Sequence, residues 1–231
     1  MNGWEEGYKL NFYDARVLFC SKSDDENCEK ALNFLMQNCS NVTVCIGDWG
    51  DSIPPMMFSW SGEYILSYTS KWIIPESILK NASLAAINFH PAPPSRPGAA
   101  CANFALYDGD TEFGVTCHHM IPLVDSGKII VARKFPIFES DNVSSLLNRS
   151  HEELLKLFIE IVTILKEGKN LPESDEVWNR KNFHTRDELN GNLRRISADI
   201  SKEELERRIR ATLYNEWKPY IVIHGVKFYM G

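Results

Sequence analysis

Short apolar runs alternate with segments of helical periodicity along most of the chain. Runs such as ARVLFC at residues 15–20 are continuous and end in turn residues, which is typical of buried strands. Between such runs, apolar residues recur every three or four positions, as in residues 28–36, which favours helices. We expect strands over residues 15–20, 42–46, 64–67, 84–89, 114–120 and 127–137, and helices over residues 28–36, 75–79, 99–107 and 150–166.

Two helix starts are predicted from a serine that is followed three positions later by a glutamate. Ser150 precedes Glu153, and Ser201 precedes Glu204. In such a capping box the serine oxygen accepts a backbone N–H of the first turn, and the glutamate folds back onto the cap. We therefore expect both serines to be N-caps.

The alternation of strands and helices predicts an α/β fold with a Rossmann-like, mainly parallel sheet flanked by helices. The sequence turns polar and charged after residue 170, so we expect a main domain over residues 1–170 and a small region over residues 171–231. That region is predicted to hold a helix and a terminal β-hairpin at residues 219–231. The strand edges of an aromatic hairpin need to be covered, so we expect a second copy of the chain to cover them in a homodimer. Packing of the hairpin on its own domain is the alternative.

Composition narrows the class of protein. The net charge of −6 and the lack of clustered Lys and Arg argue against a nucleic-acid partner. No apolar run is long enough to cross a membrane, and the N-terminus lacks a signal-peptide pattern. The six cysteines form no C-x-x-C pair, which favours reduced thiols and a cytoplasmic protein.

In the stretch AAINFHPAPPSRPG at residues 85–98, a hydrophobic strand is followed by polar side chains and then by several prolines. Asn88 and His90 are two positions apart, so they point to the same side of the strand end. Prolines restrict the following loop, which predicts a rigid site where α/β sheets bind ligands. No G-x-G-x-x-G follows the first strand, so a dinucleotide site is not supported.

A carboxylate extends this candidate site. Asp125 stands in a turn with Ser126 and Gly127 between two predicted strands, and this turn could lie beside the Asn88 strand. An amide can donate to a developing oxyanion, an imidazole can pass a proton, and a carboxylate can orient the imidazole or accept the proton. Taken alone, Asn88 is usually a turn or strand-cap residue, Asp125 a turn residue and His90 a structural histidine, but together they suit transfer of an acyl-type group.

The neighbouring Cys117, His118 and His119 invite a metal interpretation. Adjacent residues on a strand point to opposite faces, so they cannot easily share one ion, and we expect no metal. Cys117 lacks any local signature of an activated nucleophile.

The segments NFHP, the Pro-Gly after it, GVTCHHM and VDSG resemble the signature of the formyltransferases that use N10-formyltetrahydrofolate. That family pairs an Asn-x-His at a strand end with a later Asp-x-Gly, and Asn88, His90 and Asp125 match these positions. The resemblance runs over about residues 15–137 and is specific over residues 87–128. HPAPPSRPG and NFALY are most similar to the branch that formylates amino groups on nucleotide-linked sugars.

The resemblance implies that the amine of a nucleotide-linked amino-dideoxy sugar, of the dTDP-3- or 4-amino type, attacks the formyl carbon of N10-formyltetrahydrofolate. Asn88 and His90 would steady the oxyanion, and Asp125 with His90 would move the proton. Such sugars usually end in surface glycans. The resemblance assigns Trp72, Ile73, Ile74, Leu123, Val124 and Asp125 to the co-substrate, and Lys71, Tyr68 and Asn103 to the sugar nucleotide, with Lys71 either meeting a diphosphate or remaining solvated.

Other reactions on the same fold stay open. A methionyl-tRNA formyltransferase would need a larger, basic C-terminal domain, and a glycinamide-ribonucleotide formyltransferase would normally lack a terminal hairpin. A formyltetrahydrofolate hydrolase usually carries an added regulatory domain. A non-catalytic folate- or nucleotide-binding protein is the alternative from another class, and an intact Asn88, His90 and Asp125 set counts against it. The base, the sugar and the choice between a C3 and a C4 amine stay undetermined.

Overall fold

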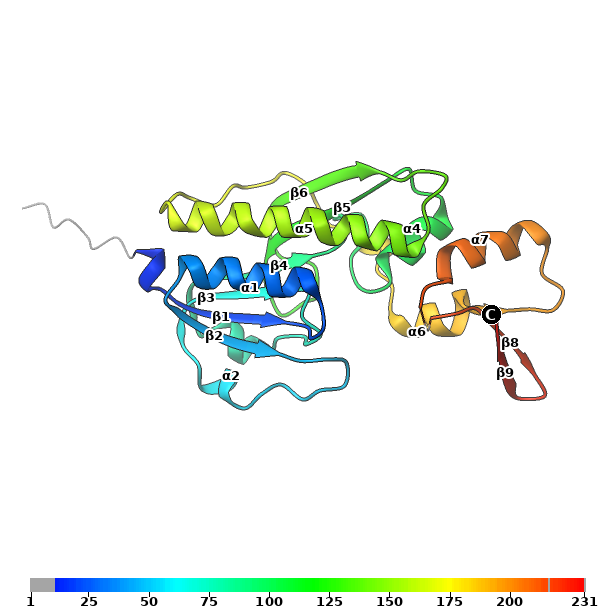
Figure 1. Ribbon diagram of the computed structural model, residues 1–231, viewed down its shortest axis with the longest axis horizontal. Helices are drawn as coiled ribbons and strands as arrows, with labels where there is room; N and C mark the ends of the chain where they lie inside the picture. Colours follow the sequence, from blue (N-terminus) through cyan, green and yellow to red (C-terminus); the bar gives the residue numbers. More distant parts are fainter. Residues whose placement is uncertain (1–10, 216, 231) are drawn as a thin grey trace, which may run out of the picture.

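The centre of the molecule is a six-stranded sheet in the order β2-β1-β3-β4-β5-β6, seen in a computed structural model that describes residues 11–215 and 217–230 (Figure 1). Its first four strands pair in parallel, whereas β5 and β6 run antiparallel. The predicted mainly parallel α/β sheet is therefore confirmed, with an antiparallel edge. The strands are β1 (Arg16–Ser21), β2 (Asn41–Ile46), β3 (Gly62–Tyr68), β4 (Ala82–His90), β5 (Glu112–His119) and β6 (Ile129–Pro136).

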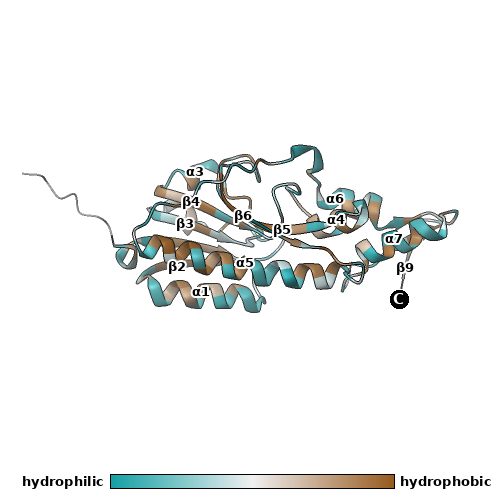
Figure 2. Ribbon diagram, turned by 90° about the horizontal axis from the view of Figure 1, so that it is seen from above, coloured by the Kyte–Doolittle hydropathy of each residue, from teal (hydrophilic) through white to brown (hydrophobic). Residues whose placement is uncertain are grey.

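Helices cover both faces of this sheet. Two of them, α1 and α5, lie side by side on one face, and α3 lies on the other (Figures 1 and 2). Alternation along β1 explains the two layers, because Val17 and Phe19 pack in the α1 and α5 core while Leu18 packs with α3. The helices before residue 170 are η1 (Phe12–Asp14), α1 (Glu26–Asn38), α2 (Met56–Ser59), α3 (Glu76–Leu79), α4 (Cys101–Asp108) and α5 (Val143–Lys166).

Helix α5 begins seven residues before the predicted start, and the prediction that Ser150 is its N-cap is wrong. Asn142 caps the helix through a reciprocal pair of hydrogen bonds with Ser145. Ser150 lies inside the helix, and its hydroxyl donates to the carbonyl of Pro91 at 2.7 Å. A local Ser-x-x-Glu match cannot settle a helix start when the residues before it, such as Val143, continue the apolar stripe. Ser201, in contrast, caps its helix as predicted.

The C-terminal part forms a second sheet in the order β7-β8-β9. The predicted hairpin is confirmed: β8 and β9 pair antiparallel around His224 and Gly225, whose φ angles of 49° and 81° suit a two-residue hairpin turn. Helix α7 packs on α4 through a second hydrophobic core that includes Ala211. The elements here are η2 (Arg180–Asn182), α6 (Arg186–Glu188), η3 (Leu189–Leu193), β7 (Arg195–Ile196), α7 (Lys202–Thr212), β8 (Tyr220–Ile223) and β9 (Val226–Tyr229).

Three further predictions concern compartment and membrane. All six cysteines are free thiols. Across residues 11–215 and 217–230, no helix is long and apolar enough to cross a membrane. The N-terminal stretch on which the signal-peptide prediction rests lies mostly outside the described residues.

Candidate active site

The end of β4 carries the predicted amide and imidazole. Asn88 and His90 both line a cavity of about 760 Å³. Because β5 runs antiparallel to β4, its register sets Asn88 directly opposite His118, and the Asn88 Nδ2 lies 3.1 Å from the His118 Nε2. The strand pairing thus brings a second imidazole into the site.

His118 was weighed in the sequence only as a metal ligand, so its place in this site was missed. Its Nδ1 lies 2.8 Å from the carbonyl oxygen of His119, which places a proton on Nδ1. In the neutral ring, Nε2 then carries the lone pair and accepts from the Asn88 amide. One amide hydrogen of Asn88 is engaged in this way, and the second remains for a ligand.

The carboxylate of Asp125 lies between the two imidazoles. Its Oδ2 is 3.7 Å from His90 Nδ1, and its Oδ1 is 3.4 Å from His118 Nε2. Burial, with 6% of the residue exposed, would raise the carboxyl pKa, but the charge of His90, a hydrogen bond from the doubly protonated form of His118 and one from the Gly98 N–H lower the pKa to about 2. Asp125 is therefore a carboxylate at neutral pH.

Two glycines allow the segments around Asp125 to approach so closely. Gly98 has a φ of +94° and donates its N–H to Asp125 Oδ2 at 2.8 Å. A Cβ at Gly98 would lie 2.5 Å from the carbonyl oxygen of His184. At Gly127 a Cβ would lie 1.8 Å from the carbonyl oxygen of His119. The glycines of the Pro-Gly and Asp-Ser-Gly segments are thus required because any side chain there would clash with the backbone around the site.

The proline loop after β4 is held by ion pairs that a buried arginine makes with two partly exposed carboxylates. Arg96, only 3% exposed, donates to Asp110 at 2.6 and 2.7 Å and to Asp108 at 2.5 Å. The carbonyl of Arg96 lies 3.1 Å from His90 Nε2. Both ring nitrogens of His90 therefore face oxygen atoms, so a proton on either nitrogen finds an acceptor.

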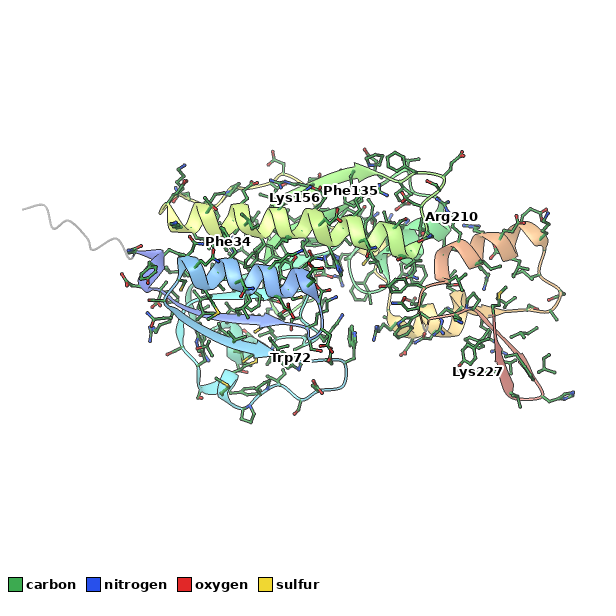
Figure 3. All side chains as sticks on the ribbon, viewed as in Figure 1. Phe34, Trp72, Phe135, Lys156, Arg210 and Lys227 are labelled. Atoms are coloured by element: carbon green, nitrogen blue, oxygen red, sulfur yellow. The ribbon has the colours of Figure 1, made fainter. Side chains whose placement is uncertain are left out.

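The residues predicted to bind the co-substrate all lie along the same cavity, namely Trp72, Ile73, Ile74, Leu123, Val124 and Asp125. Trp72, labelled in Figure 3, packs its indole onto Gly47, where a Cβ would lie 2.1 Å from the ring. Ile73 and Leu123 are 69% and 57% exposed. These apolar side chains give one end of the cavity a surface suited to a flat aromatic group.

Three residues were predicted to bind the sugar nucleotide, and they fare differently. Lys71 lines the cavity, where burial and the charges of Lys22 and Arg186 lower its pKa to about 8. Asn103 also lines it, but its amide donates to the Ala211 carbonyl at 2.8 Å and so ties α4 to α7.

Tyr68 does not line the cavity and is fully buried in the core. Its ring packs edge-on against Phe158 at 5.3 Å, and its hydroxyl lacks a hydrogen-bond partner within the described part of the chain. Alternation along β3 explains the correction, because Ser67 faces the cavity and the next residue must face the helices.

Basic and aromatic side chains meet at one part of the cavity, and the sequence did not predict that they lie together. The guanidinium of Arg186 lies over the rings of Trp49 and Trp217, at 3.8 and 4.6 Å from their centroids. The ammonium of Lys71 lies 4.9 Å from the Trp49 centroid, and Lys22 lines the same cavity. These residues come from segments far apart in the sequence, which explains why no local motif revealed them.

Metal ligation was weighed for the Cys117 to His119 stretch. Cys117 packs in the hydrophobic core, whereas His118 faces the cavity. Within the described ranges, no group of at least three His, Cys, Asp or Glu side chains could hold a metal ion.

Part of the chain matches a known protein family. Residues 61–162 match the family model described as formyl transferase. Over 98 residues the chain is 35% identical to a methionyl-tRNA formyltransferase from Listeria welshimeri, a match that covers 42% of this chain and 31% of that relative. The chain thus aligns with only about a third of that relative's length.

Solved structures share the fold along nearly the whole chain. A 4-N formyltransferase from Francisella tularensis has a TM-score of 0.74 at 17% identity, covering 93% of this chain and 96% of that one. An N-formyltransferase from Helicobacter canadensis, in complex with folinic acid and dTDP-3-aminofucose, has a TM-score of 0.71 at 17% identity, covering 92% and 85%. Residues 61–162 thus match a formyl transferase domain, and nearly the whole chain shares the fold of these solved formyltransferases, which confirms the resemblance recognised in the sequence.

Proposed function

We propose that this protein is a sugar N-formyltransferase, which moves the formyl group of N10-formyltetrahydrofolate to the amino group of a nucleotide-linked amino-dideoxy sugar. One observation carries the proposal: the Asn88, His90 and Asp125 set lines a single cavity of about 760 Å³ together with exposed apolar side chains and a group of basic and aromatic side chains. The match with the Francisella and Helicobacter enzymes supports it, because the shared fold extends over 96% and 85% of those chains.

In the proposed reaction the lone pair of the sugar amine attacks the formyl carbon. A C–N bond forms and the carbonyl π-electrons move to oxygen, where the free N–H of Asn88 stabilises the developing oxyanion. Collapse of this intermediate breaks the bond between the formyl carbon and N10 of the folate. The amine loses one proton, and N10 of the leaving tetrahydrofolate gains one, so the enzyme needs a group that moves a proton.

The imidazoles are better suited to this proton transfer than Asp125. A carboxyl group with a pKa of about 2 is a weak base at neutral pH, and proton transfer is most efficient when the pKa is near the working pH. A proton that reaches His90 Nδ1 has Asp125 Oδ2 beside it at 3.7 Å. Asp125 thus orients the ring and stabilises its cationic form, which modifies the role inferred from the sequence.

The two kinds of lining residue suit the two substrates. The exposed apolar side chains of Ile73 and Leu123 would pack on the pterin, and nearby backbone groups would meet its polar edge. Lys71, Lys22 and Arg186 supply positive charge for a diphosphate. Trp49 and Trp217 add flat surfaces suited to a nucleotide base. We keep residue 170 as the proposed boundary between the main and C-terminal domains.

We also propose that the C-terminal hairpin joins two copies of the chain in a homodimer. Its side chains Ile223, Val226, Phe228 and Tyr229 are each about half exposed, which leaves an apolar surface at the tip of the molecule. Light scattering after size exclusion should give a dimer, and Phe228→Ser should give a monomer. The free thiols suit the reducing cytoplasm, which we propose as the compartment.

The deciding experiment offers N10-formyltetrahydrofolate with dTDP- and UDP-linked 3-amino and 4-amino sugars, and detects a gained formyl group by mass spectrometry. Methionyl-tRNA and glycinamide ribonucleotide are tested as rival acceptors. Asn88→Ala should abolish product formation, and Asn148→Ala, an exposed asparagine on α5, should not. Transfer to methionyl-tRNA alone, or folate consumption without any acceptor, would reject the sugar assignment. Folate binding without turnover would favour a binding protein.

A further inference from the structure

A long irregular segment after α5 runs back across the sheet toward α6 (Figure 1). We call residues 171–185 the strap. Backbone hydrogen bonds tie it to three parts of the fold: Ser174 N–H donates to Ile129 at 3.1 Å, Asn179 N–H donates to Pro94 at 2.9 Å, and His184 accepts from Ala99 N–H at 2.9 Å. An irregular segment of this length that is so firmly bound usually serves the site it crosses.

Trp178 on the strap packs behind both imidazoles. Its indole meets the ring of His118 edge to face, with centroids 4.9 Å apart at 84°, and lies 5.9 Å from the ring of His90. Its Nε1–H donates to the carbonyl of Gly127 at 2.8 Å. Trp178 lies outside the cavity lining, whereas both imidazoles belong to it. The indole therefore covers the side of the imidazoles that does not face the substrates.

Arg180 holds the backbone of the Asp125 turn. Its Nη1 donates to the carbonyl of Val124 at 2.6 Å and to that of Asp125 at 3.2 Å. Asp125 has a φ of +44°, a conformation that costs free energy for a residue with a Cβ. Donors on two successive carbonyls help to keep the backbone in this conformation. The strap thus supports both the imidazoles and the carboxylate.

We propose that Trp178 and Arg180 are positioning residues, which hold Asp125, His90 and His118 in the geometry needed for proton transfer. The inference rests on the proposed formyl transfer. The distances of 3.4 and 3.7 Å between the carboxylate and the imidazoles leave little room for displacement. A misplacement of about 1 Å far from the reacting atoms can lower a rate about 100-fold.

The test compares Arg180→Met and Arg180→Lys with Lys181→Met, an exposed neighbour on the strap. We expect Arg180→Met to lower kcat about 100-fold and to change KM for either substrate less than about threefold. Arg180→Lys should recover part of kcat, because an ammonium still donates to a carbonyl. Lys181→Met should behave as wild type. An unchanged kcat in Arg180→Met, or a parallel rise in KM, would overturn the role of Arg180.

Trp178 is tested by Trp178→Leu and Trp178→Phe, with the imidazole C–H resonances of His90 and His118 recorded by NMR without substrates. A lost indole removes its ring current, so both resonances should move in the leucine variant and less in the phenylalanine variant; in Arg180→Met the indole remains, so resonances that move there report displaced imidazoles. The kcat should fall about 100-fold in Trp178→Leu and about tenfold or less in Trp178→Phe. Unmoved resonances in Trp178→Leu would overturn the positioning role. Recording the resonances of Arg180→Met as well guards against a leucine variant that fails to fold.

The two readouts separate this inference from the proposed function. If wild type transfers no formyl group to any acceptor, the proposed function fails, but the resonances still report whether the strap positions the imidazoles. If wild type turns over and the variants do so equally well, the positioning role fails alone.

Discussion

Replacing Asp125 with asparagine tests the central electrostatic contact of the proposed site. The substitution keeps the size of the side chain and removes the charge that faces His90 Nδ1 at 3.7 Å and His118 Nε2 at 3.4 Å. For an effective dielectric constant of about 20, an imidazolium and a carboxylate at 3.7 Å attract each other by about 4.5 kcal/mol. If this attraction acts when the imidazole takes the proton, its loss lowers kcat about 1,000-fold.

The same substitution changes stability in a defined direction. The carboxyl pKa is lowered from 3.8 to about 2 in the folded protein, which corresponds to about 2.5 kcal/mol of stability at neutral pH. Because the folded pKa lies below the unfolded pKa, this contribution is present above about pH 4 and is lost as the pH falls to about 2. Asp125→Asn should therefore unfold more easily at pH 7 and show less additional loss below pH 4.

The assay measures single-turnover formyl transfer at saturating substrates, together with urea unfolding at several pH values. Asp175→Asn, an exposed carboxylate on the strap, is the matched control and should equal wild type in both measurements. A kcat within tenfold of wild type would refute the electrostatic argument. The attraction between the Asp125 carboxylate and an imidazolium would then have no part in the rate-limiting step.

Three further predictions concern residues around this contact. Lys71→Met should raise KM for the sugar nucleotide at least about tenfold with little change in kcat. In wild type, the same KM should rise above about pH 8, because the ammonium of Lys71 then loses its charge. Lys71→Arg should remove that rise. Tyr68→Phe should leave turnover unchanged and increase the free energy of unfolding by about 1 kcal/mol, measured in urea, because it removes a buried hydroxyl without a partner; a raised KM would restore Tyr68 to the substrate site. His118→Phe should lower kcat about 100-fold, and an unchanged kcat would exclude that imidazole from the proton path.

The sequence was most informative where chemistry and local geometry coincide. Asn88 and His90 share a face because they are two apart on one strand, so their convergence needs only the strand itself. The proximity of Asp125 was an inference from the fold class and from the resemblance, and the structure brings its carboxylate to the two imidazoles.

Other features depended on strand register and on contacts between distant segments, which cannot be read from a sequence. His118 reaches Asn88 only through the register of an antiparallel β5, and a shift by one residue would have presented Cys117 instead. The resemblance assigned Tyr68 to the substrate, but successive residues of β3 face opposite sides of the sheet, and the ring of Tyr68 lies in the core. Trp178 lies eight residues beyond the predicted domain boundary, in a segment without the periodicity that marks packed elements.

The strap also has a consequence for how the protein is made and cut. All strands of the main sheet, and every residue of the Asn88, His90 and Asp125 set, precede residue 137 in the chain. During synthesis the sheet can close before residues 171–185 leave the ribosome, so a folded core without its full support exists first. A protease that removed the C-terminal region at the irregular segment would return the molecule to that earlier state, with its six-stranded sheet retained, its second hydrophobic core opened and its reactive groups loosely held.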